Sequence, residues 1–272
     1  MPSPRLASLP IALALVALAG CDADSGPSRT EQAFRWAGEV PAGGWVRVRD
    51  LNGSVRVARA PGREVVITAT RRWRGRRPQE VRFVAERDGG NVTACALWGG
   101  RGECSAEHYG GGERRRGWFQ RLFDRRASVS VDYLVALPAG VGVDARTVNG
   151  RVIVADVASE VVARTTNGSI VLGAAGGRVD AQTVNGSVRA RLDGLPAGAR
   201  VALRTVNGSV TALLPEAASA EVALKTVNGR VKSEFPVQVS HGDRRSLRGT
   251  LNGGQARVAL ETVNGSVTLG RL

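Results

Sequence analysis

Residues whose side chains could do chemistry are few in this chain of 272 residues. The two histidines, His108 and His241, each lie in a glycine-containing stretch without a nucleophile or base at a matching spacing. No Gly-x-Ser-x-Gly elbow, phosphate-binding glycine loop or His-Glu-x-x-His motif is present. Paired carboxylates, which glycosidases need, could arise only between distant stretches, because the candidate acids stand singly: Asp144, Asp156, Asp180 and Asp193. The sequence therefore predicts no catalytic residue and no cofactor.

Two of the three cysteines, Cys95 and Cys104, flank a glycine-rich stretch. In an exported protein such a pair predicts a disulfide, whose short loop would contribute roughly 2–3 kcal/mol of stability. His108 follows at a spacing that could suit a metal ion, but a zinc site usually has four ligands and no fourth one is nearby. We therefore predict a disulfide and no metal site.

Arginine dominates the basic residues, since Lys225 and Lys232 are the only lysines in a chain of net charge +14. A cation or glutamine stands directly before each threonine of a repeated motif, in the order Arg146, Arg164, Gln182, Arg204, Lys225, and this column is interrupted at Gly249 and Glu261. Stacked like charges repel unless an anion bridges them. We predict a polyanion-binding stripe of Arg146, Arg164, Arg204 and Lys225, with Arg151, Arg189 and Arg191 nearby. The alternative is a solvated basic face.

The motif that would position these residues is Thr-Val-Asn-Gly, which recurs through the C-terminal half. Its asparagines, and those of one looser copy, are 18, 18, 22, 21, 24 and 12 residues apart: Asn149, Asn167, Asn185, Asn207, Asn228, Asn252 and Asn264. A period near twenty residues is typical of a repeat architecture. Around each motif, apolar and polar residues alternate, as in half-buried strands.

Asn-Gly by itself suits either a two-residue hairpin or the corner of a solenoid. Recurrence of the same threonine and asparagine favours the corner, because stacked asparagines can form an amide ladder. Aromatic residues are only 4% of the chain, which also fits a narrow solenoid. We predict a mainly β fold, a β-solenoid of about 20-residue rungs, with an antiparallel meander or sandwich as the alternative.

The N-terminus reads as a signal peptide over residues 1–20 that ends in Leu18-Ala19-Gly20-Cys21. This end resembles the lipobox of bacterial lipoproteins, which implies that Cys21 carries a lipid. Asp22 resembles the signal that retains lipoproteins on the periplasmic face of the inner membrane, with the outer membrane as the other possibility. We predict a flexible tether over residues 21–38, an N-terminal β region over 39–137 and the repeat domain over 138–272.

A basic insertion interrupts the β pattern at residues 105–127. Within it, Trp118, Phe119, Leu122 and Phe123 would gather on one face of a short helix, with arginines on the other face. Such a segment could contact a membrane or a protein partner, or could cap an open end of the solenoid.

Thr-Val-Asn-Gly-Ser-Val repeats behind a lipobox resemble the bacterial DUF4097 family of adhesin-like β-strand repeat proteins. The resemblance implies a right-handed single-stranded β-helix and no catalytic residues. We therefore expect a lipid-anchored, non-enzymatic envelope scaffold or adhesin-like surface that binds an anionic envelope polymer. The alternatives are an envelope-stress accessory that binds a membrane protein, and a carbohydrate-active β-helix enzyme. An exported protein is not expected to bind nucleic acid.

Overall fold

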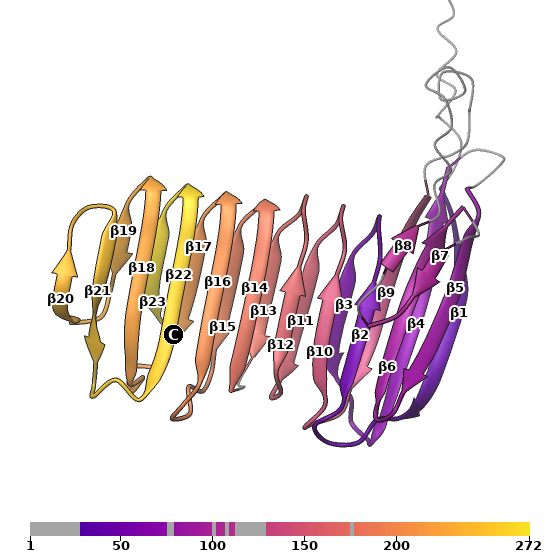
Figure 1. Ribbon diagram of the computed structural model, residues 1–272, viewed down its shortest axis with the longest axis horizontal. Coiled ribbons are helices and arrows are strands. Elements are labelled where there is room, and N and C mark those ends of the chain that lie inside the picture. The colour runs from indigo at the N-terminus through magenta and orange to yellow at the C-terminus, as the bar shows by residue number, and fades with distance from the viewer. Residues whose placement is uncertain (1–27, 75–78, 100–101, 107–108, 112–128, 175–176) are drawn as a thin grey trace, which may run out of the picture.

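The fold is built from strands packed into two large sheets, A and B, as a computed structural model shows (Figure 1). The structure describes residues 28–74, 79–99, 102–106, 109–111, 129–174 and 177–272. Helices are absent from these residues, so none of them has the length and apolarity of a membrane span. The predicted mainly β class is confirmed.

Sheet A contains ten strands. From the N-terminal end of the molecule, their order is β1 (Arg29–Glu39), β4 (Glu64–Trp73), β9 (Val129–Leu137), β3 (Val55–Arg59), β11 (Val152–Val157), β13 (Ile170–Ala174), β15 (Val188–Leu192), β17 (Val210–Leu214), β23 (Val267–Arg271) and β19 (Val231–Ser233).

Sheet B contains eleven strands. In the same direction they are β5 (Val81–Asp88), β6 (Asn91–Trp98), β2 (Trp45–Arg49), β10 (Gly142–Arg146), β12 (Val161–Arg164), β14 (Arg178–Asn185), β16 (Arg200–Asn207), β22 (Ala256–Asn264), β18 (Ala220–Asn228), β21 (Ser246–Leu251) and β20 (Gln238–Gly242). A small separate sheet pairs β7 (Gly102–Cys104) with β8 (Tyr109–Gly111).

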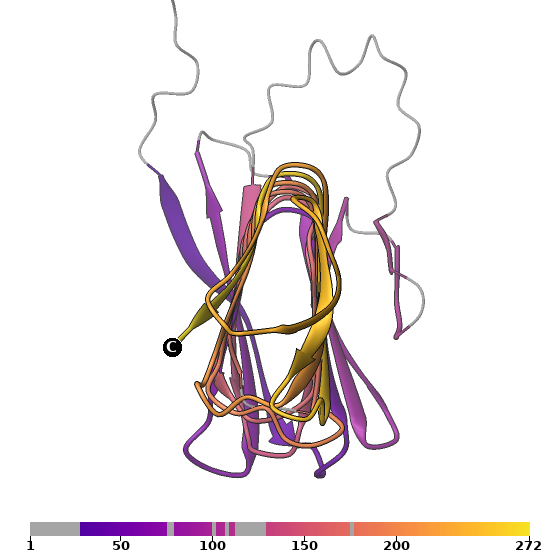
Figure 2. The ribbon, with the colours of Figure 1, turned by 90° about the vertical axis from the view of Figure 1, so that its left-hand side faces the viewer.

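Each Thr-Val-Asn-Gly motif carries the chain from sheet B into sheet A. We call one such strand of sheet B, its Asn-Gly corner and the following strand of sheet A a rung. For example, β14 pairs in parallel with β12 and β16, whereas β15 pairs in parallel with β13 and β17. Because the strands on either side of the corner belong to different sheets, Asn-Gly is a corner and not a hairpin (Figure 2).

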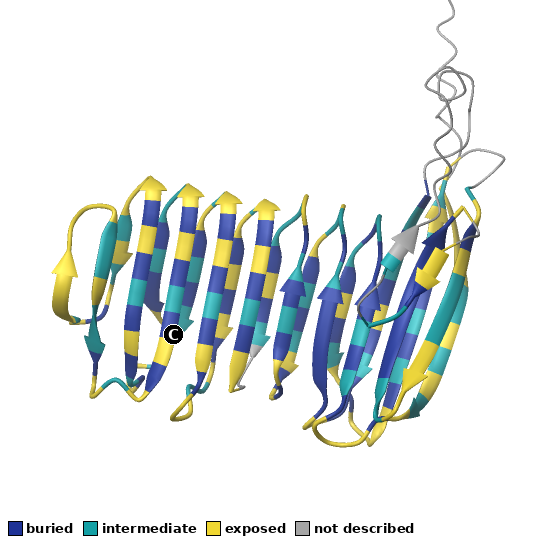
Figure 3. Cartoon of the chain, viewed as in Figure 1, coloured by how far each residue is buried: buried dark blue, intermediate teal, exposed yellow. Residues whose placement is uncertain are grey.

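Alternation of side chains along each strand fills the space between the sheets. In β14, Val179, Ala181 and Thr183 are buried, while Arg178 and Gln182 are exposed. The same inward rows of Val, Ala and Leu repeat in register from rung to rung, which produces the bands of buried residues in Figure 3. Small residues suffice because the sheets lie close together, as the low aromatic content led us to expect.

The asparagines of the motif form the predicted ladder. Beyond Asn149, which only accepts, each side-chain amide of the ladder donates to the asparagine oxygen of the adjacent rung at 2.8 or 2.9 Å. In space the order is Asn149, Asn167, Asn185, Asn207, Asn264, Asn228. Asn252 does not belong to this ladder, because it follows the antiparallel strand β21 and donates to the Ala218 carbonyl at 3.0 Å. Its inclusion in the predicted ladder is wrong.

The threonine of each motif forms a hydrogen bond with the motif glycine of the adjacent rung. The Thr183 hydroxyl donates to the Gly168 carbonyl of the adjacent rung at 2.8 Å, and Thr205 does the same with Gly186 at 2.7 Å. A Cβ at Gly186 would lie only 2.1 Å from the Gly168 carbonyl oxygen. The motif glycine is therefore required by the close approach of neighbouring backbones.

Substituting Gly186 by alanine should therefore force two rungs apart. We expect Gly186→Ala to lower the free energy of unfolding by about 1–3 kcal/mol, the usual cost of overpacking. Gly177→Ala is the control, because a Cβ there would meet no atom within 4 Å. Urea denaturation of both variants measures the effect, and equal midpoints would contradict this role of the corner glycine.

The last rung of the chain does not lie at the end of the molecule. Strand β22 lies between β16 and β18, and β23 lies between β17 and β19, all in parallel register. Residues 256–271 thus fill a slot between two rungs that precede them in sequence. The end of the molecule is formed instead by the antiparallel strands β21 and β20 (Figure 1).

The N-terminal boundaries differ from those predicted. Residues 29–38 are not a tether, because they belong to β1, which pairs with β4. A register shift between Gln32 and Phe34 breaks the alternation that would have marked this strand. Likewise, β8 extends β structure to Gly111, inside the predicted insertion. Phe34 of β1 stacks on Phe83 of β5, with ring centroids 5.8 Å apart, and joins the outermost strands of the two sheets.

Candidate functional site

The outer face of sheet B brings the predicted basic column together. Parallel pairing puts Arg146 beside Arg164, Arg164 beside Gln182, and Gln182 beside Arg204. Glu261 does not interrupt the end of the column. It lies inside it, between Arg204 and Lys225, because of the inserted last rung.

Acidic side chains of sheet B already neutralise most of this column. Arg146 donates to both carboxylate oxygens of Asp144 at 2.9 Å, and the buried Arg49 donates to the same carboxylate at 2.7 Å. Arg164 pairs with Asp180, and Arg204 pairs with Glu261, both at 3.2 Å. The bridging anion that we expected between stacked cations is thus supplied by the protein itself.

The remaining residues of the predicted stripe lie elsewhere. Arg189 and Arg191 are exposed on β15, and Arg151 immediately precedes β11, so all three belong to sheet A and not to sheet B. The chain passes a corner between these residues and the column, and outward side chains of the two sheets point in opposite directions. The prediction that one stripe includes both sets is therefore wrong.

A second row of cations on sheet B escaped the sequence analysis. Arg178, Arg200 and Arg257 are direct neighbours on β14, β16 and β22, and all three are exposed. Arg257 pairs with Glu221 at 3.3 Å, whereas Arg178 and Arg200 make no ion pair within the described residues. The signal that could have revealed this row is an arginine five residues before three of the motif threonines, Thr183, Thr205 and Thr262. The rung that lies between Arg200 and Arg257 in sequence hides their adjacency in space.

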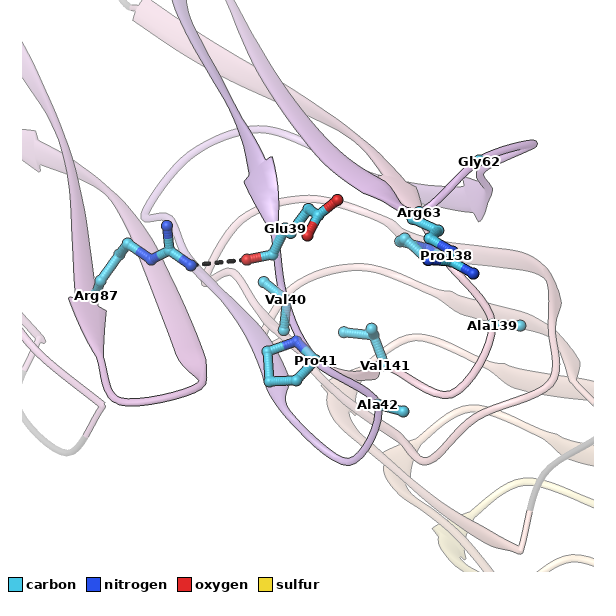
Figure 4. Close-up of a pocket in the computed structure, with 10 residues that line it drawn as sticks. All are labelled: Glu39, Val40, Pro41, Ala42, Gly62, Arg63, Arg87, Pro138, Ala139 and Val141. Carbon is cyan, nitrogen blue, oxygen red and sulfur yellow. Dashed lines mark hydrogen bonds between the residues drawn. The ribbon is translucent and has the colours of Figure 1, made fainter.

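Three hollows lie on the surface, two of them on sheet B and one near the N-terminal end. One of about 460 Å³ lies over β18 and β22, beside the hairpin of β20 and β21, and Arg248 and Arg257 help to line it. A smaller one of about 300 Å³ lies between the column and the exposed motif valines Val206, Val227 and Val263. A third, of about 620 Å³, lies among loops near the N-terminal end (Figure 4). There Arg87 is engaged with the Glu39 carbonyl at 2.7 Å and with the ring of Trp36.

The N-terminal rung contains a buried carboxyl group. Asp50 occupies the motif position that holds threonine elsewhere, and only 2% of it is exposed. Burial raises its pKa from 3.8 to about 7, partly offset by the amides of Leu51 and Asn52. Neither carboxyl oxygen is in hydrogen-bonding geometry with a described residue, and the same holds for the buried Trp98 indole N–H and Tyr133 hydroxyl. Sequence reasoning missed this group.

The predicted disulfide is confirmed, with the sulfur atoms of Cys95 and Cys104 2.07 Å apart. It fastens β7 over the outer face of β6, where Tyr109 donates to the Ala96 carbonyl at 2.7 Å. Other predicted site residues lie outside the described part of the chain: Cys21, His108, Trp118, Phe119, Leu122 and Phe123. Within the described part, no group of three or more metal-binding side chains is present.

Comparison with known proteins agrees with the resemblance seen in the motifs. Residues 141–270 match the family model described as Toastrack DUF4097. Two crystal structures are similar: a candidate cell adhesion protein from Clostridium sporogenes (10% identity, TM-score 0.45, covering 88% of this chain and 99% of that one) and a candidate adhesin from Bacteroides fragilis (9% identity, TM-score 0.38, covering 89% and 97%). Both are too distant to transfer a function. No curated protein matches this chain.

Proposed function

We propose, on the premise that residues 141–270 belong to the Toastrack DUF4097 family, that this protein is a lipid-anchored envelope protein without enzymatic activity. Its two-sheet body would present an adhesin-like surface that binds an anionic polymer. The sequence Leu18-Ala19-Gly20-Cys21 supports the lipid anchor. We also take the rungs for a single-stranded right-handed β-helix of about 20 residues each, as the resemblance implies.

The observation that carries the binding proposal is the row of Arg178, Arg200 and Arg257. Neighbouring strands in a sheet lie about 4.8 Å apart. Arg178 and Arg200, which pair with no acid of the described residues, are therefore held side by side. Their repulsion is relieved when an anion bridges them, and arginine can bind carboxylate, sulfate or phosphate in a bidentate way. The rigid parallel register holds this arrangement before any ligand arrives.

Binding of the full chain, purified in detergent, to immobilised heparin tests this function. We expect the double variant Arg178→Ala/Arg200→Ala to bind heparin at least about tenfold more weakly, because hydrogen bonds to charged groups contribute roughly 1.5–3 kcal/mol each. Arg151→Ala/Arg189→Ala is the matched control, since it removes the same charge from sheet A. Equal binding by the two variants would show that only net charge matters and would contradict a site on sheet B.

A second function, contact with a membrane or protein partner through Trp118, Phe119, Leu122 and Phe123, is favoured by one observation. The Phe34–Phe83 stack lies between the outermost strands of the two sheets, and Phe34, Phe83 and Trp36 all pack against the core at this end. These four residues are therefore not required as a cap. Replacing all four by serine and measuring recovery of membrane proteins by cross-linking tests this candidate, and unchanged recovery would remove it.

A further inference from the structure

We infer that the hollow over β18 and β22, together with the neighbouring surface of β16, is a binding site for one or two sugar units of a linear acidic polysaccharide. This inference rests on the proposed function and names its ligand class and its place. Several cations that make no ion pair within the described residues stand around this concave surface of sheet B.

The floor of this site is aliphatic and shallow. Ala202, Ala259 and Ala223 lie side by side on β16, β22 and β18, and each is partly exposed. Their side chains end at Cβ, whereas the residues two positions before and after them are long. The alanines alone would not define a site, but they explain why the surface is hollowed here.

Long charged side chains form the two sides. One side consists of Arg200 and Arg257, with Arg178 beyond them and Glu221 next to Arg257. Arg204, Glu261 and Lys225 form the outward row on the other side of the alanines, where they also line the hollow of about 300 Å³. The two sides are four residues apart along each strand, which corresponds to about 13 Å.

The hairpin of β20 and β21 closes one end. Arg248 is opposite Ala223 in the antiparallel pairing of β21 with β18, and Thr250 is opposite Glu221. Together with Ser240 of β20, these residues help to enclose the hollow of about 460 Å³. This volume lies within the range of roughly 300–1,000 Å³ that is usual for small-molecule sites.

The charges of the site favour an anion. Its two acids are engaged, Glu221 with Arg257 and Glu261 with Arg204. Four cations around the floor make no ion pair within the described residues: Arg178, Arg200, Lys225 and Arg248. They stand on both sides and at the closed end, so a ligand with anionic groups along its length can contact several of them at once.

The shape distinguishes a sugar chain from other anions. The C–H face of a pyranose ring can pack on the alanine floor, and the hydroxyls of Ser240 and Thr250 offer hydrogen bonds to sugar hydroxyls. The alanine floor lies between two rows of long side chains, so a flat lipid surface would meet those rows before the floor, and a single phosphate would use only one side. Uronate groups on successive sugars would reach the opposing sides in turn.

Oligomannuronate of defined length is the probe, titrated into the full chain in detergent by calorimetry. We expect Ala259→Phe, which fills the hollow and removes no charge, to weaken oligomannuronate binding at least tenfold. Thr268→Phe is the matched control, because Thr268 faces outward from the same rung on sheet A. If Ala259→Phe fails to fold, as judged by its melting temperature, Ala223→Leu replaces it.

The outcomes separate the two proposals. Unchanged oligomannuronate binding by a folded Ala259→Phe variant would overturn the sugar site, while the heparin result for Arg178→Ala/Arg200→Ala would still support the proposed function. If both Arg178→Ala/Arg200→Ala and Arg151→Ala/Arg189→Ala bind heparin as well as the unchanged chain does, the proposed function itself is overturned. The chain could instead bind phosphatidylglycerol–phosphatidylcholine vesicles and not oligomannuronate. If Ala259→Phe then lost this vesicle binding, the ligand would be a lipid surface and the sugar assignment would be overturned.

Discussion

Deleting residues 256–272 is expected to abolish the folded state of the C-terminal half, although only the last rung is removed. The deletion takes away the buried side chains of Val258, Leu260, Val267 and Leu269. At roughly 2 kcal/mol for each, their burial alone contributes on the order of 10 kcal/mol, comparable to the whole stability of a typical domain. In addition, β16 and β18 would lose their shared neighbour and expose unpaired edges.

Circular dichroism and size-exclusion chromatography of the truncated chain measure this effect. A synthetic peptide of residues 254–272 should restore the native spectrum, because the slot that it fills has a defined register on both sides. A peptide of scrambled sequence is the control. A truncated chain that melts within a few degrees of the full chain would show that the last rung is peripheral.

Replacing Asp50 by threonine is expected to stabilise the protein at neutral and alkaline pH. In the folded state the pKa of Asp50 is about 7, because burial in the core disfavours the carboxylate. In the unfolded chain the pKa returns to about 3.8. At a pH where the unfolded state is ionised, this difference of roughly three pKa units lowers the free energy of unfolding by about 4 kcal/mol. Threonine carries no such cost.

The neighbours of Asp50 offset the cost of burying its carboxylate only in part, through the amides of Leu51 and Asn52 and the Trp98 indole. The hydroxyls of Tyr109 and Tyr133 and the Trp98 indole lie near it, and burial raises the pKa of both tyrosines, so they remain protonated. The carboxylate of Asp132 raises the pKa of Asp50 further. A threonine hydroxyl at this position would instead face the carbonyl of Val131. This carbonyl lies against Gly53 in the same way as the Gly53 carbonyl lies against Gly150 in the next rung.

The sign of the pH dependence follows from the raised pKa. Below about pH 3 both states are protonated, so Asp50→Thr should change stability little there. As pH rises from 4 to 7 the wild-type chain loses stability relative to the variant, and above pH 7 the difference stays constant at up to about 4 kcal/mol. Chemical denaturation at pH 4, 6 and 8 measures it. Thr147→Asp is the reciprocal control and should introduce the same loss. A difference independent of pH would contradict the assignment.

The repeat itself was readable because every copy has the same residue types at the same short spacing. Thr183 and Asn185 bond to the adjacent rung in the same way as Thr205 and Asn207 do, so a short window around one copy predicts which residues of the next copy point inward and which point outward. The strand β1 was missed for the opposite reason. Its place depends on pairing with β4 and on Phe34 meeting Phe83, and neither is visible in a window of a few residues.

By itself the sequence determined the class of fold, the stacked Asn-Gly corners, the disulfide and the existence of a basic column, because all of these follow from residue type and short-range spacing. Only the tertiary structure decided which cations have no acidic partner among the residues that the structure describes. The insertion of β22 between β16 and β18 places Glu261 within the column and Arg257 beside Arg200. Adjacency across a sheet is set by the order of strands in space, and here that order departs from their order in the chain.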